Sequence, residues 1–175
     1  MREHFDVYDL DRLPTGLVLP RGAAHDPAQC QVVIHVCLFN RKGELLIQRR
    51  SMRKKGFPGF WDFSVGGGVL AGETVREAAE RELQEELGLS LKIPGPAAVT
   101  LAFEGGYDDY FLADWDGGLD ELRLQPEEVM DARWVTREEA LTLLAAGEFA
   151  PFWPSFVSLL FDLHRHMGLS VDAKD

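Results

Sequence analysis

Cysteine is rare in this sequence, with two residues, Cys30 and Cys37, among 175. They lie seven positions apart in an apolar stretch, a pattern more typical of two small buried thiols than of a disulfide or half of a metal site. The chain does not need cross-links, because a protein of this size buries roughly 70% of the surface that its unfolded state exposes.

Long apolar runs and an excess of positive charge are also missing. No run approaches the roughly 18 to 20 residues that span a bilayer, and residues 1–6 lack the order of a signal peptide, so we expect a cytoplasmic protein without a membrane partner. Lys and Arg number 18 against 29 Asp and Glu, for a formal net charge of -11. This balance argues against a nucleic-acid polymer as partner, since such binding needs clustered cations.

Turn signals and apolar segments alternate along the chain. They predict a hairpin of strands 5–8 and 17–19 within an N-terminal extension over residues 1–28. Further strands are expected at 31–39, 44–49, 97–103, 108–115 and 129–135, helices at 74–87, 137–146 and 154–167, and a loop from Pro58 to Gly68. This interleaving indicates an α/β protein with a mixed sheet between helices, one domain over residues 1–175 and a possible homodimer.

The segment that ends at Gly88 has the marks of a helix. Thr74 and Glu77 form a T-x-x-E capping box, and Gly88 stands where a left-handed C-terminal cap is expected. The core-facing stripe recurs every four residues, at Val75, Ala79, Leu83 and Leu87.

Three glutamates gather on one edge of this helix. At 3.6 residues per turn, Glu82, Glu85 and Glu86 fall within roughly 100° of arc, where like charges repel. A hard divalent cation converts this repulsion into a binding site, so Mg²⁺ or Mn²⁺ is the expected cofactor. A solvated acidic helix is the alternative, but the preceding glycine loop favours the metal, because a carbonyl of Gly66 or Gly67 can supply a further oxygen ligand.

The same segment resembles a known family. Residues 67–89 match the Nudix box, G-x5-E-x7-R-E-U-x-E-E-x-G-U with U aliphatic, at every specified position. The resemblance implies a Nudix-type α/β/α sandwich that uses Mg²⁺ or Mn²⁺ to hydrolyse a diphosphate bond in a small phosphorylated metabolite or nucleotide. The implied attacking group is water activated by the metal.

The resemblance also implies roles for individual residues. The expected metal ligands are Glu82, Glu86, Glu85 and the carbonyl of Gly66. Arg81 would orient the carboxylates through a pair with Glu73. The general base is expected outside the box at Glu127 or Glu128, of which Glu127 is the one assigned to the site, while Glu82 stays a possible base.

Much of residues 38–65 is similar to isopentenyl-diphosphate isomerases and their hydrolase relatives. A basic cluster in this stretch can bind phosphates, and its aromatic residues can cover a substrate, although loop cations are often only solvated and aromatics often fill a core. The expected substrate-binding residues are Arg49, Arg50, Lys55 and Trp61, with Lys54, Phe57 and Phe60 as further candidates.

The similarity leaves two alternatives to hydrolysis open. An isomerase would need a cysteine where this chain has Gly66 and histidines where it has Gly68 and Gln31. His25 and His35 lie near the metal histidines of the isomerases but do not occupy the aligned positions. A catalytically inactive nucleotide-binding regulator would be expected to lose glutamates of the box, all of which are present here.

Overall fold

The computed structural model describes residues 3–23, 26 and 28–166. Its elements are β1 (His4–Tyr8), β2 (Pro14–Pro20), β3 (Gln31–Phe39), β4 (Leu45–Arg50), β5 (Trp61–Asp62), β6 (Val65–Gly68), α1 (Val75–Leu87), β7 (Val99–Phe103), β8 (Gly106–Asp114), the 3₁₀ helix η1 (Leu119–Glu121), β9 (Val129–Val135), α2 (Arg137–Ala145) and α3 (Pro154–Arg165). β1 and β2 form a separate sheet, and seven strands form the large one in the order β5-β4-β3-β8-β7, with β6 paired to β3 and β9 to β4. The large sheet is mixed, because β3 and β8 are parallel and the other pairs antiparallel.

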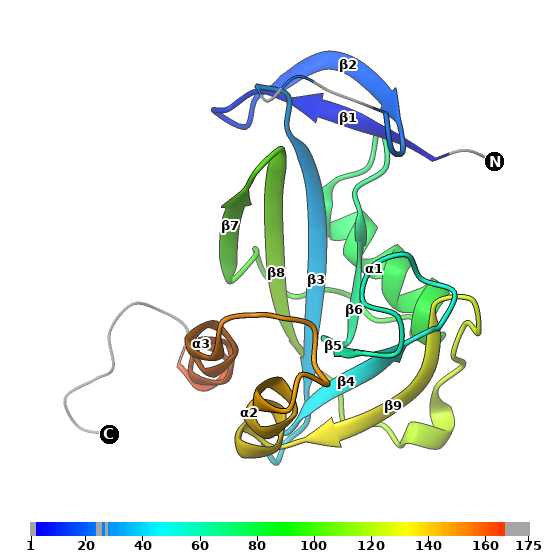
Figure 1. Cartoon of the computed structure of the whole chain (residues 1–175), viewed down its shortest axis with the longest axis vertical. Helices are drawn as coiled ribbons and strands as arrows, with labels where there is room; N and C mark the ends of the chain where they lie inside the picture. Colours follow the sequence, from blue (N-terminus) through cyan, green and yellow to red (C-terminus); the bar gives the residue numbers. More distant parts are fainter. Residues whose placement is uncertain (1–2, 24–25, 27, 167–175) are drawn as a thin grey trace.

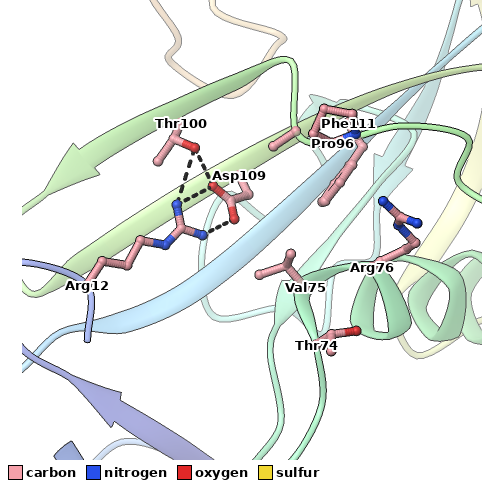
Figure 2. A pocket seen from close by; sticks show the side chains of 9 residues that line it. Arg12, Thr74, Val75, Arg76, Pro96, Thr100, Asp109 and Phe111 are labelled. Carbon is pink, nitrogen blue, oxygen red and sulfur yellow. Dashed lines mark hydrogen bonds and ion pairs between the residues drawn. The ribbon is translucent and has the colours of Figure 1, made fainter. Parts of the chain in front are cut away.

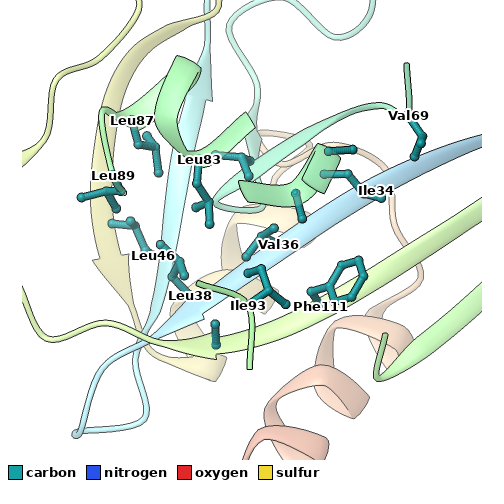
Figure 3. Packing of buried hydrophobic residues seen from close by; sticks show 14 of the residues in the cluster. Ile34, Val36, Leu38, Leu46, Val69, Leu83, Leu87, Leu89, Ile93 and Phe111 are labelled. Atoms are coloured by element: carbon teal, nitrogen blue, oxygen red, sulfur yellow. The ribbon is translucent and has the colours of Figure 1, made fainter. Parts of the chain in front are cut away.

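β3 separates two hydrophobic cores. Its even-numbered residues from Val32 to Leu38 pack with Leu83 and Leu87 of α1 (Figure 3). Cys37 and Phe39 belong to the opposite cluster, which contains residues of α2 and α3. The large sheet thus lies between α1 on one face and α2 with α3 on the other (Figure 1), which confirms the predicted α/β/α sandwich.

The predicted ends of α1 are confirmed. The Thr74 side chain accepts from the Glu77 backbone amide, the Glu77 carboxylate accepts from the Thr74 amide, and Gly88 adopts the left-handed conformation with φ 72°. The expected helix 154–167 ends as α3 at Arg165, and its last expected residue lies outside the described residues. Within the described residues, no helix has both the length and the apolar character needed to cross a bilayer.

The prediction of a loop from Pro58 to Gly68 is wrong in its second half. β5 pairs with β4, and the three glycines of β6 pair with residues 33–35 of β3. A Cβ on Gly68 would lie 2.4 Å from Cε1 of Phe5, so any larger residue in this strand would require the Phe5 ring of the hairpin to shift.

The predicted N-terminal hairpin is present and is tied to the large sheet. Arg12, in a left-handed conformation with φ 62°, donates to both carboxylate oxygens of the buried Asp109 (Figure 2). Thr100 donates to the same carboxylate at 2.5 Å. The Tyr107 hydroxyl donates to the Leu10 carbonyl at 2.5 Å, so β7 and β8 hold the loop between β1 and β2.

Candidate active site

A small polar cavity of about 100 Å³ lies beside the acidic edge of α1. Five segments line this carboxylate cavity: the two ends of the hairpin, the loop after β4, the glycine strand β6, helix α1 and the segment before β9. Its lining residues are Glu3, Arg21, Lys54, Gly66, Gly67, Glu82, Glu85, Glu86, Gln125 and Glu128. The cavity therefore brings together the predicted metal ligands and residues far from them in the sequence.

Glu86 is the most buried glutamate of this cavity, with a relative exposure of 3%. Its Oε2 atom is buried and has no hydrogen-bond partner among the described residues. Burial, followed by the charge of Glu82, raises the pKa of Glu86 to about 8. A buried carboxylate oxygen without a partner costs free energy, which a bound cation would recover.

Arg81 holds three carboxylates and one carbonyl at once. Its Nε and Nη2 donate to the two Glu73 oxygens at 2.7 and 3.0 Å, which is the predicted pair. Nη1 donates to Glu82 at 2.7 Å and to Glu85 at 3.0 Å, and Nη2 also donates to the Gly68 carbonyl at 2.9 Å. Burial opposes the charge of Arg81, but Glu73 and Glu82 outweigh it and raise the pKa of the guanidinium.

Glu82 lies directly over the glycine strand. A Cβ on Gly67 would be 2.0 Å from the Glu82 Oε1 atom, so any side chain at Gly67 would displace this carboxylate. Burial raises the pKa of Glu82, against the opposing effect of Arg81. The close approach sets the Glu82 carboxylate against the backbone of β6, and carboxylate and carbonyl oxygens are the hard donors that Mg²⁺ and Mn²⁺ prefer.

The donor set fits a divalent cation but is not assembled around one point. Within the described ranges, no three His, Cys, Asp or Glu side chains form a group ready to hold a metal. Glu82 and Glu85 face Arg81, and only Glu86 keeps a buried oxygen without a partner. The fit therefore rests on the Glu86 oxygen and on the glycine backbone beneath Glu82.

The structure separates the two glutamates proposed as general base. Glu128 lines the carboxylate cavity, where it forms an ion pair with Lys54. Glu127 lies outside the cavity and is exposed, with Arg53 Nη1 at 3.3 Å from its Oε1 atom. The assignment of Glu127 to the site does not agree with this placement, because the backbone before β9 turns Glu128 inward.

The expected substrate-binding residues are scattered. Arg50 is partly buried and donates to Asp62 at 2.9 Å and to the Gly56 carbonyl at 2.9 Å, so its guanidinium is already engaged. Trp61 is buried, and the guanidinium carbons of Arg133 and Arg49 lie 4.7 and 5.8 Å from its ring centroid. Lys55 is exposed, and it is the neighbouring Lys54 that lines the cavity.

The two other aromatic candidates, Phe57 and Phe60, contact each other away from the carboxylate cavity. Phe57 is exposed and has a left-handed backbone with φ 48°, and its ring centroid is 5.9 Å from that of Phe60. Neither residue lines the carboxylate cavity.

His35 belongs to a hydrogen-bonded group on the opposite face of the sheet. Its Nδ1 atom is 2.9 Å from Asp108 Oδ1, its ring stacks on Tyr110 at 5.0 Å, and the Tyr110 hydroxyl donates to Asp108 at 2.7 Å. Burial lowers the pKa of His35, but the hydrogen bond and charge of Asp108 outweigh burial and raise it. His25 lies outside the described residues.

Cys30 and Cys37 are both buried and free, which confirms the prediction of two small buried thiols. Burial raises the pKa of the Cys37 thiol well above its usual range, so this thiol is held in its neutral form.

A larger cavity, of about 610 Å³, is lined by residues of β7, β8, the first turn of α1 and the segment before β7 (Figure 2). Its acidic lining residue, Asp109, is fully engaged by Arg12 and Thr100. This cavity therefore offers no free carboxylate to a cation.

Sequence reasoning missed three residues of the carboxylate cavity: Glu3, Arg21 and Gln125. Glu3 and Arg21 lie at the two ends of the hairpin, and no pattern in the neighbouring sequence indicates where the hairpin packs on the rest of the fold. Gln125 is drawn to the end of α1 by a hydrogen bond from its amide to the Glu86 carbonyl, at 3.0 Å.

An α/β/α sandwich with glutamates of one helix over a glycine strand is the architecture of a class of hydrolases that act on phosphoric anhydrides. A model of the NUDIX domain matches residues 30–156. An uncharacterised Nudix hydrolase of Listeria monocytogenes is 46% identical over 162 residues, which cover 92% of this chain and 95% of that protein. The chain belongs to the Nudix family.

A second relative and a solved structure are also similar over most of the chain. An isopentenyl-diphosphate Delta-isomerase of Klebsiella pneumoniae is 31% identical over 85% of this chain and 84% of that protein. The crystal structure of DR0079 from Deinococcus radiodurans has a TM-score of 0.71 and 28% identity, over 90% of this chain and 97% of that one. The protein is an enzyme, a hydrolase that acts on pyrophosphate bonds.

Proposed function

We propose that the protein hydrolyses the diphosphate bond of a nucleoside diphosphate derivative or a similar phosphorylated metabolite, with Mg²⁺ or Mn²⁺ as cofactor and water as the attacking group. The buried Oε2 atom of Glu86, which has no partner among the described residues, carries this proposal. It is a carboxyl oxygen that lines the same cavity as Glu82 and the glycine strand, and a bound cation would stabilise its ionised form.

Glu82, Glu86 and a carbonyl of β6 are the proposed ligands, with the more exposed Glu85 beside them. When bound, the cation would neutralise charge on phosphate oxygens and acidify a water molecule. Arg81 is proposed to keep Glu82 and Glu85 in place, since its guanidinium donates to both carboxylates. Hydrogen bonds to Glu73 fix the orientation of the guanidinium.

Glu128 and Lys54 are proposed to act on the substrate side of the cavity. Glu128 carries a carboxylate that can accept a proton from the attacking water, and its ion pair with Lys54 fixes its place in the cavity. Lys54 can bind a phosphate oxygen as a point charge. Arg50 is proposed to support the loop through Asp62 rather than to meet the substrate.

Two features argue against isomerisation. A Cβ at Gly66 would lie 2.7 Å from the His35 ring, so the cysteine that an isomerase needs does not fit this position without a shift of His35. A histidine at Gly68 would likewise require the Phe5 ring to shift, since a Cβ there would lie 2.4 Å from its Cε1 atom. An inactive regulator is disfavoured because the box glutamates and the arginine that holds them are all in place.

The test is a panel of phosphoric anhydrides offered with Mg²⁺ and with Mn²⁺, in water enriched in heavy oxygen, with the products identified by mass spectrometry. Hydrolysis with the label in one product supports the proposal and identifies the phosphorus attacked. Binding of nucleotides without turnover would support a regulator, and conversion of isopentenyl diphosphate without hydrolysis would support an isomerase.

A further inference from the structure

The hairpin of β1 and β2 is seated on the Nudix box loop. The Phe5 ring covers Gly68, the Ala71 amide donates to the His4 carbonyl at 2.8 Å, and the Gly72 amide donates to Asp6 at 2.7 Å. At its other end, the hairpin is held to β8 by Arg12 and Asp109. The hairpin therefore has a fixed position relative to the glutamates of α1.

Arg21 follows β2 directly and lines the carboxylate cavity together with Glu3. Its Nη1 atom donates to Glu3 Oε2 at 2.5 Å, and its guanidinium carbon lies 5.9 Å from the centroid of the Phe5 ring. The two paired side chains are 61% and 43% exposed. An exposed ion pair contributes little to stability, so Arg21 can exchange Glu3 for an anion of higher charge at small cost.

Few side chains of the cavity carry the positive charge that binds a phosphate. Its acidic lining residues are all glutamates, and its basic ones are Lys54 and Arg21. Lys54 is paired with Glu128, deeper in the site than the exposed Arg21. A guanidinium presents a planar fork of donors that matches two phosphate oxygens, which an ammonium does not.

We propose that Arg21 is a substrate-binding residue, which releases Glu3 and binds non-bridging oxygens of the diphosphate group. The inference rests on the proposed function and adds to it that the hairpin, outside the Nudix box, supplies part of the phosphate site. Arg21 contributes to substrate binding and not to the binding of the cation, because it pairs only with Glu3 among the cavity's glutamates.

The test compares three variants: Arg21→Ala, Arg21→Lys and the control Arg41→Ala. Arg41 is a matched choice, because it is also exposed and forms a surface ion pair, with Asp116 at 3.2 Å, away from the cavity. Calorimetry measures the binding of methylenediphosphonate, a diphosphate that cannot be hydrolysed, with and without Mg²⁺. Electron paramagnetic resonance measures Mn²⁺ binding, and steady-state kinetics separates KM from kcat.

We expect Arg21→Ala to weaken diphosphonate binding and to raise KM about tenfold, with kcat changed by no more than about threefold, because a charge-assisted bidentate contact is lost. Arg21→Lys should lie between wild type and Arg21→Ala, and Arg41→Ala should match wild type. Mn²⁺ binding should be the same in all variants.

Diphosphonate binding by Arg21→Ala that equals wild type, an equal loss in Arg41→Ala, or absence of binding by wild type would overturn the inference. So would a parallel loss of Mn²⁺ binding, which would make Arg21 part of the metal site or of the fold. A wild type that binds diphosphonate through Arg21 but hydrolyses no anhydride would refute the proposed function alone.

Discussion

Burial of Glu86 opposes its ionisation, and a cation would remove this opposition. Replacement by glutamine keeps the volume but removes the charge and one metal ligand. We therefore expect Glu86→Gln to lower kcat by at least about a hundredfold while the protein stays folded. Steady-state kinetics and circular dichroism check this, with metal-free unfolding in urea as the control for stability. Near-normal turnover would contradict the assignment of Glu86 as a ligand.

Glu127 and Glu128 are adjacent in the sequence but differ in surroundings, so they form a matched pair for a second prediction. Glu128→Gln removes a carboxylate inside the cavity, and we expect a loss of about a hundredfold in kcat, as for the loss of a general base. Glu127→Gln removes an exposed surface charge, for which an effect within about twofold is expected. The reverse order would restore Glu127 as the site residue.

The distinction between these glutamates was not available from the sequence. Neighbouring residues point in different directions, and which one faces the cavity depends on the turn in which the Glu128 and Val129 amides donate to the Gln125 carbonyl at 2.9 and 2.8 Å. Lys54 and Lys55 present the same difficulty. By contrast, the contact of Arg81 with Glu73 was predictable, because the family motif fixes both positions.

At the scale of secondary structure, the Glu82 side chain packs directly against the backbone of β6 at Gly67. We expect Gly67→Ala to displace the Glu82 carboxylate, because the new Cβ would lie 2.0 Å from its Oε1 atom. Mn²⁺ affinity should fall by roughly ten- to a hundredfold, as for lost support of a metal ligand. The control is Gly95→Ala, since a Cβ there meets nothing within 4 Å. Equal Mn²⁺ affinity in both variants would contradict the role of β6.

The pair of His35 and Asp108 predicts how stability depends on pH. Because the folded pKa of His35 is raised above the unfolded value of 6.5, its contribution is fully present below about pH 6.5 and is lost as pH rises through the raised pKa. The urea midpoint of wild type should therefore fall as pH rises above about 6.5. Asp108→Asn should reduce this fall, and an equal fall in both proteins would exclude the pair as its cause.

Elements with a local signal were predictable, and those that depend on distant contacts were not. The boundaries of β3, β9 and α1 follow from apolar periodicity and from the caps at Thr74 and Gly88. β6 was expected as a loop, because three glycines carry no side-chain pattern and their pairing with β3 joins segments some thirty residues apart. The docking of the hairpin, and with it Arg21, depends on the same kind of distant contact.

At the scale of the whole molecule, a net charge of -11 and a cavity of glutamates both predict that a divalent cation stabilises the fold. A cation that binds only the folded state adds about 2.7 kcal/mol at a hundredfold excess over Kd. For a protein of this size, this corresponds to a rise in Tm on the order of 5–10 °C. EDTA should abolish activity and the rise in Tm, and Mg²⁺ or Mn²⁺ should restore both.

Sodium chloride at equal ionic strength separates this effect from general screening, and Glu86→Gln should respond to Mg²⁺ much as to sodium. Full activity in EDTA, or an equal rise in Glu86→Gln, would mean that the carboxylate cavity is not where the cation acts.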